Sequence, residues 1–117
     1  GLLGSAVYGL SELKRDEIKR ARLVGNPGCY PTSALLPLVP LIKKNVINHK
    51  NIVINSVSGV SGAGRGAQAG TIFCEVNEGF KAYKIGEHRH TPEIEESLKE
   101  ITGISLRVTF TPHLAPM

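Results

Sequence analysis

Apolar residues recur with helical spacing in the first half of the chain, between turns rich in glycine and proline. The spacing predicts a helix that starts at Ser11, its N-cap, and ends before the turn at residues 25–28. A second, buried helix is predicted over residues 32–45, where Pro37 and Pro40 would bend it or delay its start because each removes an amide donor. The apolar face of the first helix comprises Leu13, Ile18, Ala21 and Leu23.

The second half alternates strand and helix patterns. Apolar or β-branched runs predict strands over residues 51–58, 71–76, 82–85 and 104–112. A helix is predicted between Thr91, its N-cap, and Gly103, with Pro92 at its first position and a buried stripe of Ile94, Leu98 and Ile101. No repeated βαβ unit is visible, so we predict an α+β fold with a mixed, largely antiparallel sheet flanked by helices.

Composition limits the class of protein. The 117 residues fit a single domain, 1–117, and the net charge of +4 comes from scattered basic residues. Only 5% of residues are aromatic, and a preference for small anionic ligands explains the charge as well as nucleic-acid binding does; we predict no nucleic-acid partner. The two cysteines lack metal-type spacing, which indicates a reduced, intracellular protein without a disulfide framework. No apolar run approaches the roughly 20 residues of a membrane span. The abrupt ends, Gly1 and Met117, suggest a piece of a longer protein.

One cysteine, Cys29, lies between the Asn-Pro-Gly turn and the second predicted helix. Free amides and the positive end of the helix dipole favour a thiolate there, which suits a nucleophile. Because free cysteine is also among the most buried residue types, a packing role stays open. Cys74 lies in an apolar run, where we predict packing.

A nucleophilic cysteine needs a base, normally histidine. His88 and His90 flank Arg89, so an extended segment directs both imidazoles to one side, and a bent one directs all three side chains to one anion. Zinc bound by Cys29, His88 and His90 is an alternative that lacks an obvious fourth ligand, and we predict no metal.

A glycine-rich loop, residues 59–70, contains the pattern G-x-G-x-x-A from Gly62 to Ala67. A dinucleotide fingerprint also needs a long helix after it, and the following sequence does not predict one. We interpret the loop as a surface turn or a segment that lets the backbone approach a ligand.

Several motifs occur together in the order "AVYGLSEL", "NPGCYPTSALLPLVPLIK", "SVSGVSGAGR", "HRHTPEIE" and "FTPHLAPM". In these motifs the sequence resembles the N-acetyl-γ-glutamyl-phosphate reductases, from about Ala6 to Met117. Ser11 departs from the proline common in that family. The resemblance implies the catalytic and dimerisation domain of the semialdehyde dehydrogenase type, in a homo-oligomer, with the family's N-terminal NADP-binding domain outside this chain.

The implied reaction is NADPH-dependent reduction of an acyl phosphate to a semialdehyde through a cysteine thioester, a cytoplasmic step of arginine biosynthesis. By similarity, Cys29 is the nucleophile, His88 and His90 supply proton transfer and substrate contact, and which of them is the base stays open. The resemblance also implies nicotinamide contacts by Ser61 and Gly62; Arg65 and Arg89 are candidates for binding substrate phosphate or carboxylate. Two alternatives are a reductase of carrier-linked aminoadipyl phosphate in lysine biosynthesis and a non-catalytic dimerisation remnant.

Overall fold

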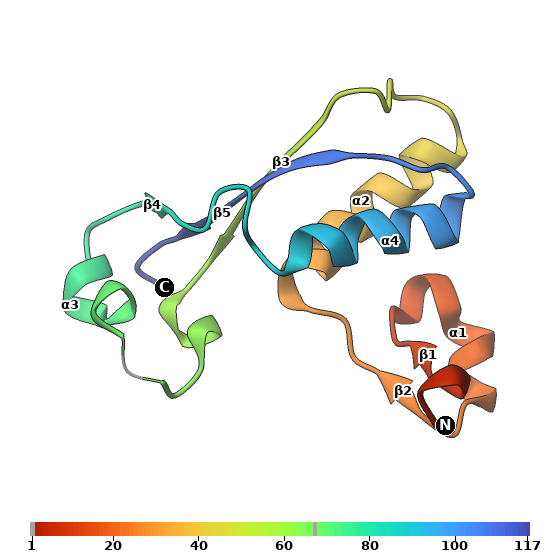
Figure 1. Cartoon of the computed structure of the whole chain (residues 1–117), viewed down its shortest axis with the longest axis horizontal. Helices are drawn as coiled ribbons and strands as arrows, with labels where there is room; N and C mark the ends of the chain where they lie inside the picture. The colour runs from red at the N-terminus through yellow and green to blue at the C-terminus, as the bar shows by residue number, and fades with distance from the viewer. Residues whose placement is uncertain (1, 67) are drawn as a thin grey trace.

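The computed structural model describes residues 2–66 and 68–117, so Gly1 and Ala67, the last position of the glycine pattern, lie outside it. Two helices, α2 (Cys29–Lys43) and α4 (His90–Thr102), lie beside a three-stranded sheet with the order β3-β5-β4 (Figure 1). The strands are β3 (Ile52–Ser58), β4 (Lys81–Ala82) and β5 (Val108–Leu114). β3 runs parallel to β5 along seven residue pairs, whereas β4 is antiparallel to β5. The predicted α+β fold with a mixed sheet and flanking helices is confirmed, and the longer ladder is the parallel one.

The core lies between the two helices and one face of the sheet. Leu35 of α2 and Ile94 and Leu98 of α4 are fully buried, and the alternation of β3 places Ile52 and Ile54 against them. The intervening Val53 is 64% exposed. The period-two pattern of the strand and the helical stripe of α4 therefore meet in one apolar cluster.

α2 begins three residues earlier than predicted, at Cys29. Pro31 consequently falls in the first turn, where its missing N–H would have no helical partner in any case. Pro37 and Pro40 lie inside the helix and do not delay its start. The early start puts the thiol of Cys29 on the first residue of the helix.

The N-terminal segment forms a separate small lobe at one end of the molecule (Figure 1). It contains the 3-10 turn η1 (Leu2–Ser5), β1 (Val7–Tyr8), α1 (Ser11–Arg20) and β2 (Val24–Gly25), and β1 pairs with β2 in parallel. The predicted N-cap is wrong, because Leu10 occupies the cap position and Ser11 is the first helical residue. Leu10 is buried, so packing of its side chain anchors the start of α1.

The predicted strand at 71–76 is wrong. The chain there forms the 3-10 turn η3 (Ala69–Thr71) and one turn of helix, α3 (Phe73–Val76). The amides bond locally, as from Asn77 N to Phe73 O at 2.7 Å, and no described strand lies beside this segment to pair with it. Cys74 is exposed, so its predicted packing role is also wrong.

Two other strands differ in extent from their predictions. Of the predicted strand at 82–85, only Ala82 lies in β4 (Lys81–Ala82), and the last strand runs over 108–114 rather than 104–112. Residues 59–66 contain only the short η2 turn (Val60–Ala63), and no long helix follows the glycine pattern within the described residues. That arrangement agrees with our exclusion of a complete dinucleotide fingerprint.

Candidate active site

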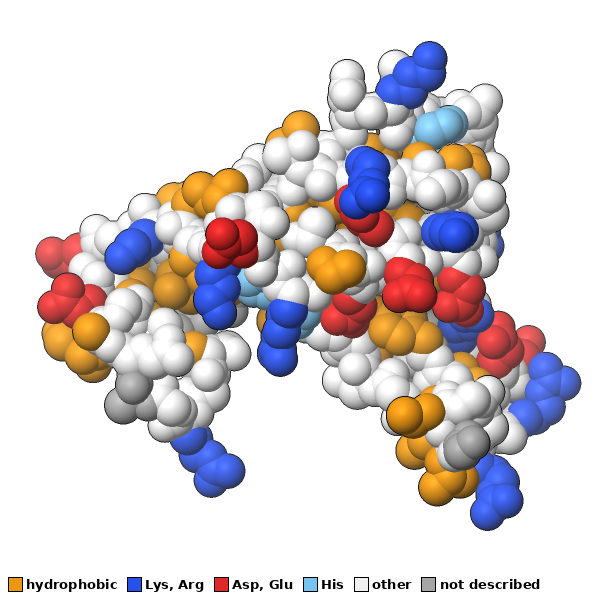
Figure 2. All heavy atoms as spheres, in the orientation of Figure 1, with side chains coloured by type: hydrophobic (Ala, Val, Ile, Leu, Met, Phe, Trp, Pro, Cys, Tyr) orange, Lys and Arg blue, Asp and Glu red, His pale blue; other side chains and the backbone are white. Residues whose placement is uncertain are grey.

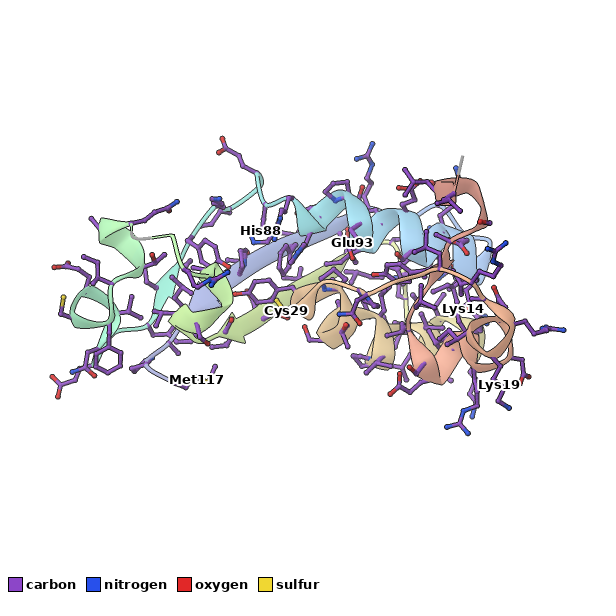
Figure 3. The ribbon with its side chains drawn as sticks, turned by 90° about the horizontal axis from the view of Figure 1, so that it is seen from below. Lys14, Lys19, Cys29, His88, Glu93 and Met117 are labelled. Carbon is purple, nitrogen blue, oxygen red and sulfur yellow. The ribbon has the colours of Figure 1, made fainter. Side chains whose placement is uncertain are left out.

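The pocket of interest lies where α2 and α4 begin, beside the C-terminal ends of β3 and β5, and measures about 610 Å³. Cys29 is exposed in its wall as the first residue of α2. Figure 3 shows Cys29 and His88 at the end of the helices that faces β4 and α3, and both residues line the pocket. Gly28, in an extended conformation, makes the turn from the Asn-Pro-Gly segment into the helix. The prediction of a thiol at a turn-to-helix junction is confirmed.

Both predicted histidines line the same pocket. The rings of His88 and His90 lie 4.8 Å apart between centroids, and each residue is less than a tenth exposed. The His90 backbone N–H donates to His88 Nδ1 at 3.1 Å, so the His88 ring satisfies the first amide of α4. The predicted Thr91 N-cap is therefore wrong: α4 already begins at His90, and Thr91 Oγ1 is buried without a partner among the described residues.

A chain of hydroxyl groups defines the other side of the His88 ring. Tyr30 Oη donates to the His113 carbonyl at 3.0 Å, and Tyr83 Oη donates to Tyr30 Oη at 3.1 Å. Because the single proton of Tyr83 is used in this way, its oxygen can only accept from His88 Nε2, at 3.5 Å. The hydrogen bonds at the two ring nitrogens are therefore both consistent with a neutral His88 that carries its proton on Nε2.

His90 occupies a different environment. Its Nε2 faces Gly28 so closely that a Cβ there would lie only 2.7 Å away. Burial lowers the pKa of His90, and nearby Arg89 lowers it further while Glu93 opposes the shift. Its Nδ1 is buried and has no partner among the described residues. A neutral imidazole with a ring nitrogen beside the residue that precedes Cys29 is suited to accept a proton.

Glu93 of α4 is hydrogen-bonded to the turn before Cys29. Its Oε1 accepts from the Gly28 N–H at 3.1 Å and from Tyr8 Oη at 2.8 Å (Figure 3). Burial and the hydrogen bond to Glu93 raise the pKa of Tyr8, which stays a donor. The sequence pattern did not single out Glu93; its place one helical turn after His90 was the available signal.

The other predicted residues divide into two groups. Gly62 and Arg89 line the pocket, whereas Ser61 and Arg65 do not. Two lysines that the sequence did not single out, Lys81 and Lys84, line it instead. No group of three or more histidine, cysteine or acidic side chains within residues 2–66 and 68–117 is arranged to hold a metal ion. No helix of the described chain has the length and hydropathy of a membrane span.

Comparison with known proteins agrees with this architecture. The family model "Semialdehyde dehydrogenase, dimerisation domain" matches residues 29–117, which include Cys29, both histidines and all three strands of the sheet. The chain belongs to this family. The match begins at Cys29, the residue with which α2 begins.

Curated relatives cover nearly the whole chain. A protein of Syntrophobacter fumaroxidans named N-acetyl-gamma-glutamyl-phosphate reductase is 61% identical over 99% of this chain and 34% of its own length. One of the same name from Pelotomaculum thermopropionicum is 60% identical over 99% of the chain and 33% of its own length. A probable chloroplastic reductase of that name from Arabidopsis thaliana is 56% identical over 95% of the chain and 28% of its own length. The chain thus spans about a third of the length of the curated relatives it matches.

Proposed function

We propose that this chain is the catalytic domain of an NADPH-dependent reductase that converts N-acetyl-γ-glutamyl phosphate to the semialdehyde and inorganic phosphate, as in arginine biosynthesis. The names of the relatives support this substrate. The observation that carries the chemistry is the position of Cys29, exposed at the start of α2 in a pocket that it shares with His88 and His90. The matching dimerisation-domain family supports a homo-oligomer.

The proposed covalent step begins with Cys29. His90 Nε2 takes the thiol proton, Sγ attacks the acyl carbon, and the bond from that carbon to the phosphate oxygen breaks, so that phosphate leaves with the bonding pair. NADPH, when bound, supplies hydride to the resulting thioester, and Gly62, with Ser61 next to it in η2, would lie at its nicotinamide end. Three glycines, Gly59, Gly62 and Gly70, line the pocket here together with Ala63 and Gln68, and glycine allows a ligand to approach the backbone closely. Collapse of the tetrahedral intermediate releases the semialdehyde and restores the Cys29 thiolate.

The two histidines have separate roles in this proposal. His88 keeps its Nδ1 occupied by the His90 amide and its proton on Nε2, so it is a hydrogen-bond donor rather than a base. When substrate is bound, its Nε2–H would exchange the 3.5 Å contact with Tyr83 Oη for the carbonyl oxygen of the substrate, which gains negative charge during attack. His90, neutral and close to Gly28, is the base.

The test replaces Cys29 with serine in a complete reductase that carries this chain. Cys29→Ser should bind NADPH normally and lose nearly all turnover, because the hydroxyl is a far weaker nucleophile at neutral pH. Cys74→Ser is the matched control: Cys74 is also an exposed free thiol but does not line the pocket, so this variant should keep full turnover. Near-normal turnover of Cys29→Ser would rule out the thioester mechanism.

A further inference from the structure

The lysine and arginine side chains that line the pocket are not balanced by acidic ones. The described lining contains three cationic side chains, Lys81, Lys84 and Arg89, and no aspartate or glutamate. All three residues are exposed, and the ion pairs within the described residues involve other cations, Lys14, Lys19 and Arg107. Figure 2 shows Lys and Arg side chains in front of exposed histidine atoms, at the hollow between the part of the molecule that carries β4 and α3 and the N-terminal lobe. Such uncompensated charge attracts anions.

Lys84 stands out because of its backbone. It has φ = 45°, in the left-handed region that non-glycine residues seldom occupy. Such a conformation costs on the order of 1–3 kcal/mol, and strain of this kind concentrates at functional sites. Glu78 shares a positive φ but does not line the pocket. The strain at Lys84 therefore coincides with a residue that lines the pocket.

Lys84 also lies close to the reacting groups. Together with burial and the neighbouring His90, the charges of Lys84 and Arg89 lower the pKa of His88. Lys84 precedes His88 in the chain and Arg89 follows it, and the charges of both lower the pKa of the same imidazole ring. An anionic group bound between them would be placed beside the His88 Nε2–H donor.

We propose that Lys84 is a substrate-binding residue, which together with Arg89 holds an anionic oxygen group of the substrate, either the phosphoryl group or the carboxylate. This inference rests on the proposed reductase function. It assigns to Lys84 the role for which the sequence had suggested Arg65, which does not line the pocket.

The experiment measures the reverse reaction of a complete reductase carrying this chain, with semialdehyde, inorganic phosphate and NADP⁺. Lys84→Met removes the charge at similar length and should raise one KM at least tenfold with a smaller change in kcat, since uniform binding is lost. A rise confined to phosphate assigns the phosphoryl group; a rise confined to the semialdehyde assigns its carboxylate. Lys84→Arg should restore most of the affinity.

Two further variants separate charge from backbone and surface effects. Lys84→Gly suits the left-handed backbone and should raise the same KM as Lys84→Met. Lys50→Met removes an exposed lysine outside the pocket and should leave both constants unchanged. The proposal is overturned if Lys84→Met changes neither KM while the unmodified reductase turns over. Absence of phosphate-dependent turnover in the unmodified protein would instead refute the proposed function.

Discussion

At the scale of single residues, two identical side chains acquire different chemistry from their neighbours. His88 and His90 are two positions apart and share a pocket. His88 is held on both ring nitrogens, by the His90 amide and by the Tyr83 hydroxyl. His90 has its Nε2 beside Gly28 and a lowered pKa, so it stays neutral at pH 7. The difference allows one imidazole to donate a hydrogen bond and the other to accept a proton.

This division predicts different kinetics for the two asparagine variants of a complete reductase. His90→Asn should slow the chemical step by about 100- to 10,000-fold, the usual contribution of a general base. His88→Asn should mainly raise KM. Since the pKa of His90 lies below its ordinary value of about 6.5, single-turnover rates should stay level near pH 7 and fall only at lower pH, when His90 becomes protonated. His90→Asn should lose this acid limb.

Single-turnover measurements across pH, with NADPH saturating, decide the assignment. A larger loss of the chemical step in His88→Asn than in His90→Asn would exchange the two roles. If neither variant slows the step tenfold, both histidines are structural and the base lies elsewhere.

At the scale of elements, the site depends on how closely the starts of α2 and α4 approach each other. Gly28 precedes α2, and the His90 ring at the start of α4 occupies the space where a side chain would begin. The Gly28 amide also donates to Glu93 Oε1 on the first turns of α4. The two helix starts are therefore joined by a hydrogen bond and by a contact that only glycine permits.

Replacing Gly28 with alanine should displace His90. The added Cβ would lie 2.7 Å from His90 Nε2 and 3.0 Å from Pro31 Cδ, so the ring must move out of its position. We expect turnover of a complete reductase to fall more than tenfold, because displaced catalytic groups lose orientation. The core of α2 and α4 should remain folded, as measured by thermal unfolding followed by circular dichroism.

The matched control is Gly25→Ala, in β2. No atom lies within 4 Å of a Cβ at Gly25, so this variant should keep its turnover. Turnover of Gly28→Ala close to that of Gly25→Ala would show that the position of His90 is not essential.

At the scale of the whole molecule, Cys29 and two histidines share one pocket, whereas the described residues contain no complete dinucleotide fingerprint. The glycine pattern that starts at Gly62 is followed, in the described residues, by 3-10 turns and the single turn of α3. A pyrophosphate site of the usual kind needs the N-terminus of a longer helix. The relatives are about three times as long as this chain.

We therefore predict that the isolated chain does not bind NADPH measurably and does not reduce the acyl phosphate. Calorimetric titration of NADPH into the chain tests this, with a complete reductase carrying the chain as the positive control. Thermal unfolding should first establish that the isolated chain is folded. Micromolar binding to the isolated chain would mean that the glycine loop forms a cofactor site by itself.

Local patterns in the sequence determined several features of this protein. Alternation predicted β3, and the left-handed Gly103 ends α4 where the pattern placed its stop. The Asn-Pro-Gly turn located Cys29 at a helix start. These features depend on neighbours within a few positions, so the sequence alone carries them.

The tertiary structure decided what depends on distant partners. The first amide of α4 is satisfied by the His88 ring rather than by Thr91, and residues 71–76 lie in η3 and α3, with no strand of the described chain paired to them. Sequence spacing could not tell that Lys84, rather than Arg65, lines the pocket of Cys29, since both lie in glycine-containing loops far from Cys29 in the chain. Charge and hydrogen-bond partners in this pocket come from α2, α4, β4 and the loops, and only folding brings them together.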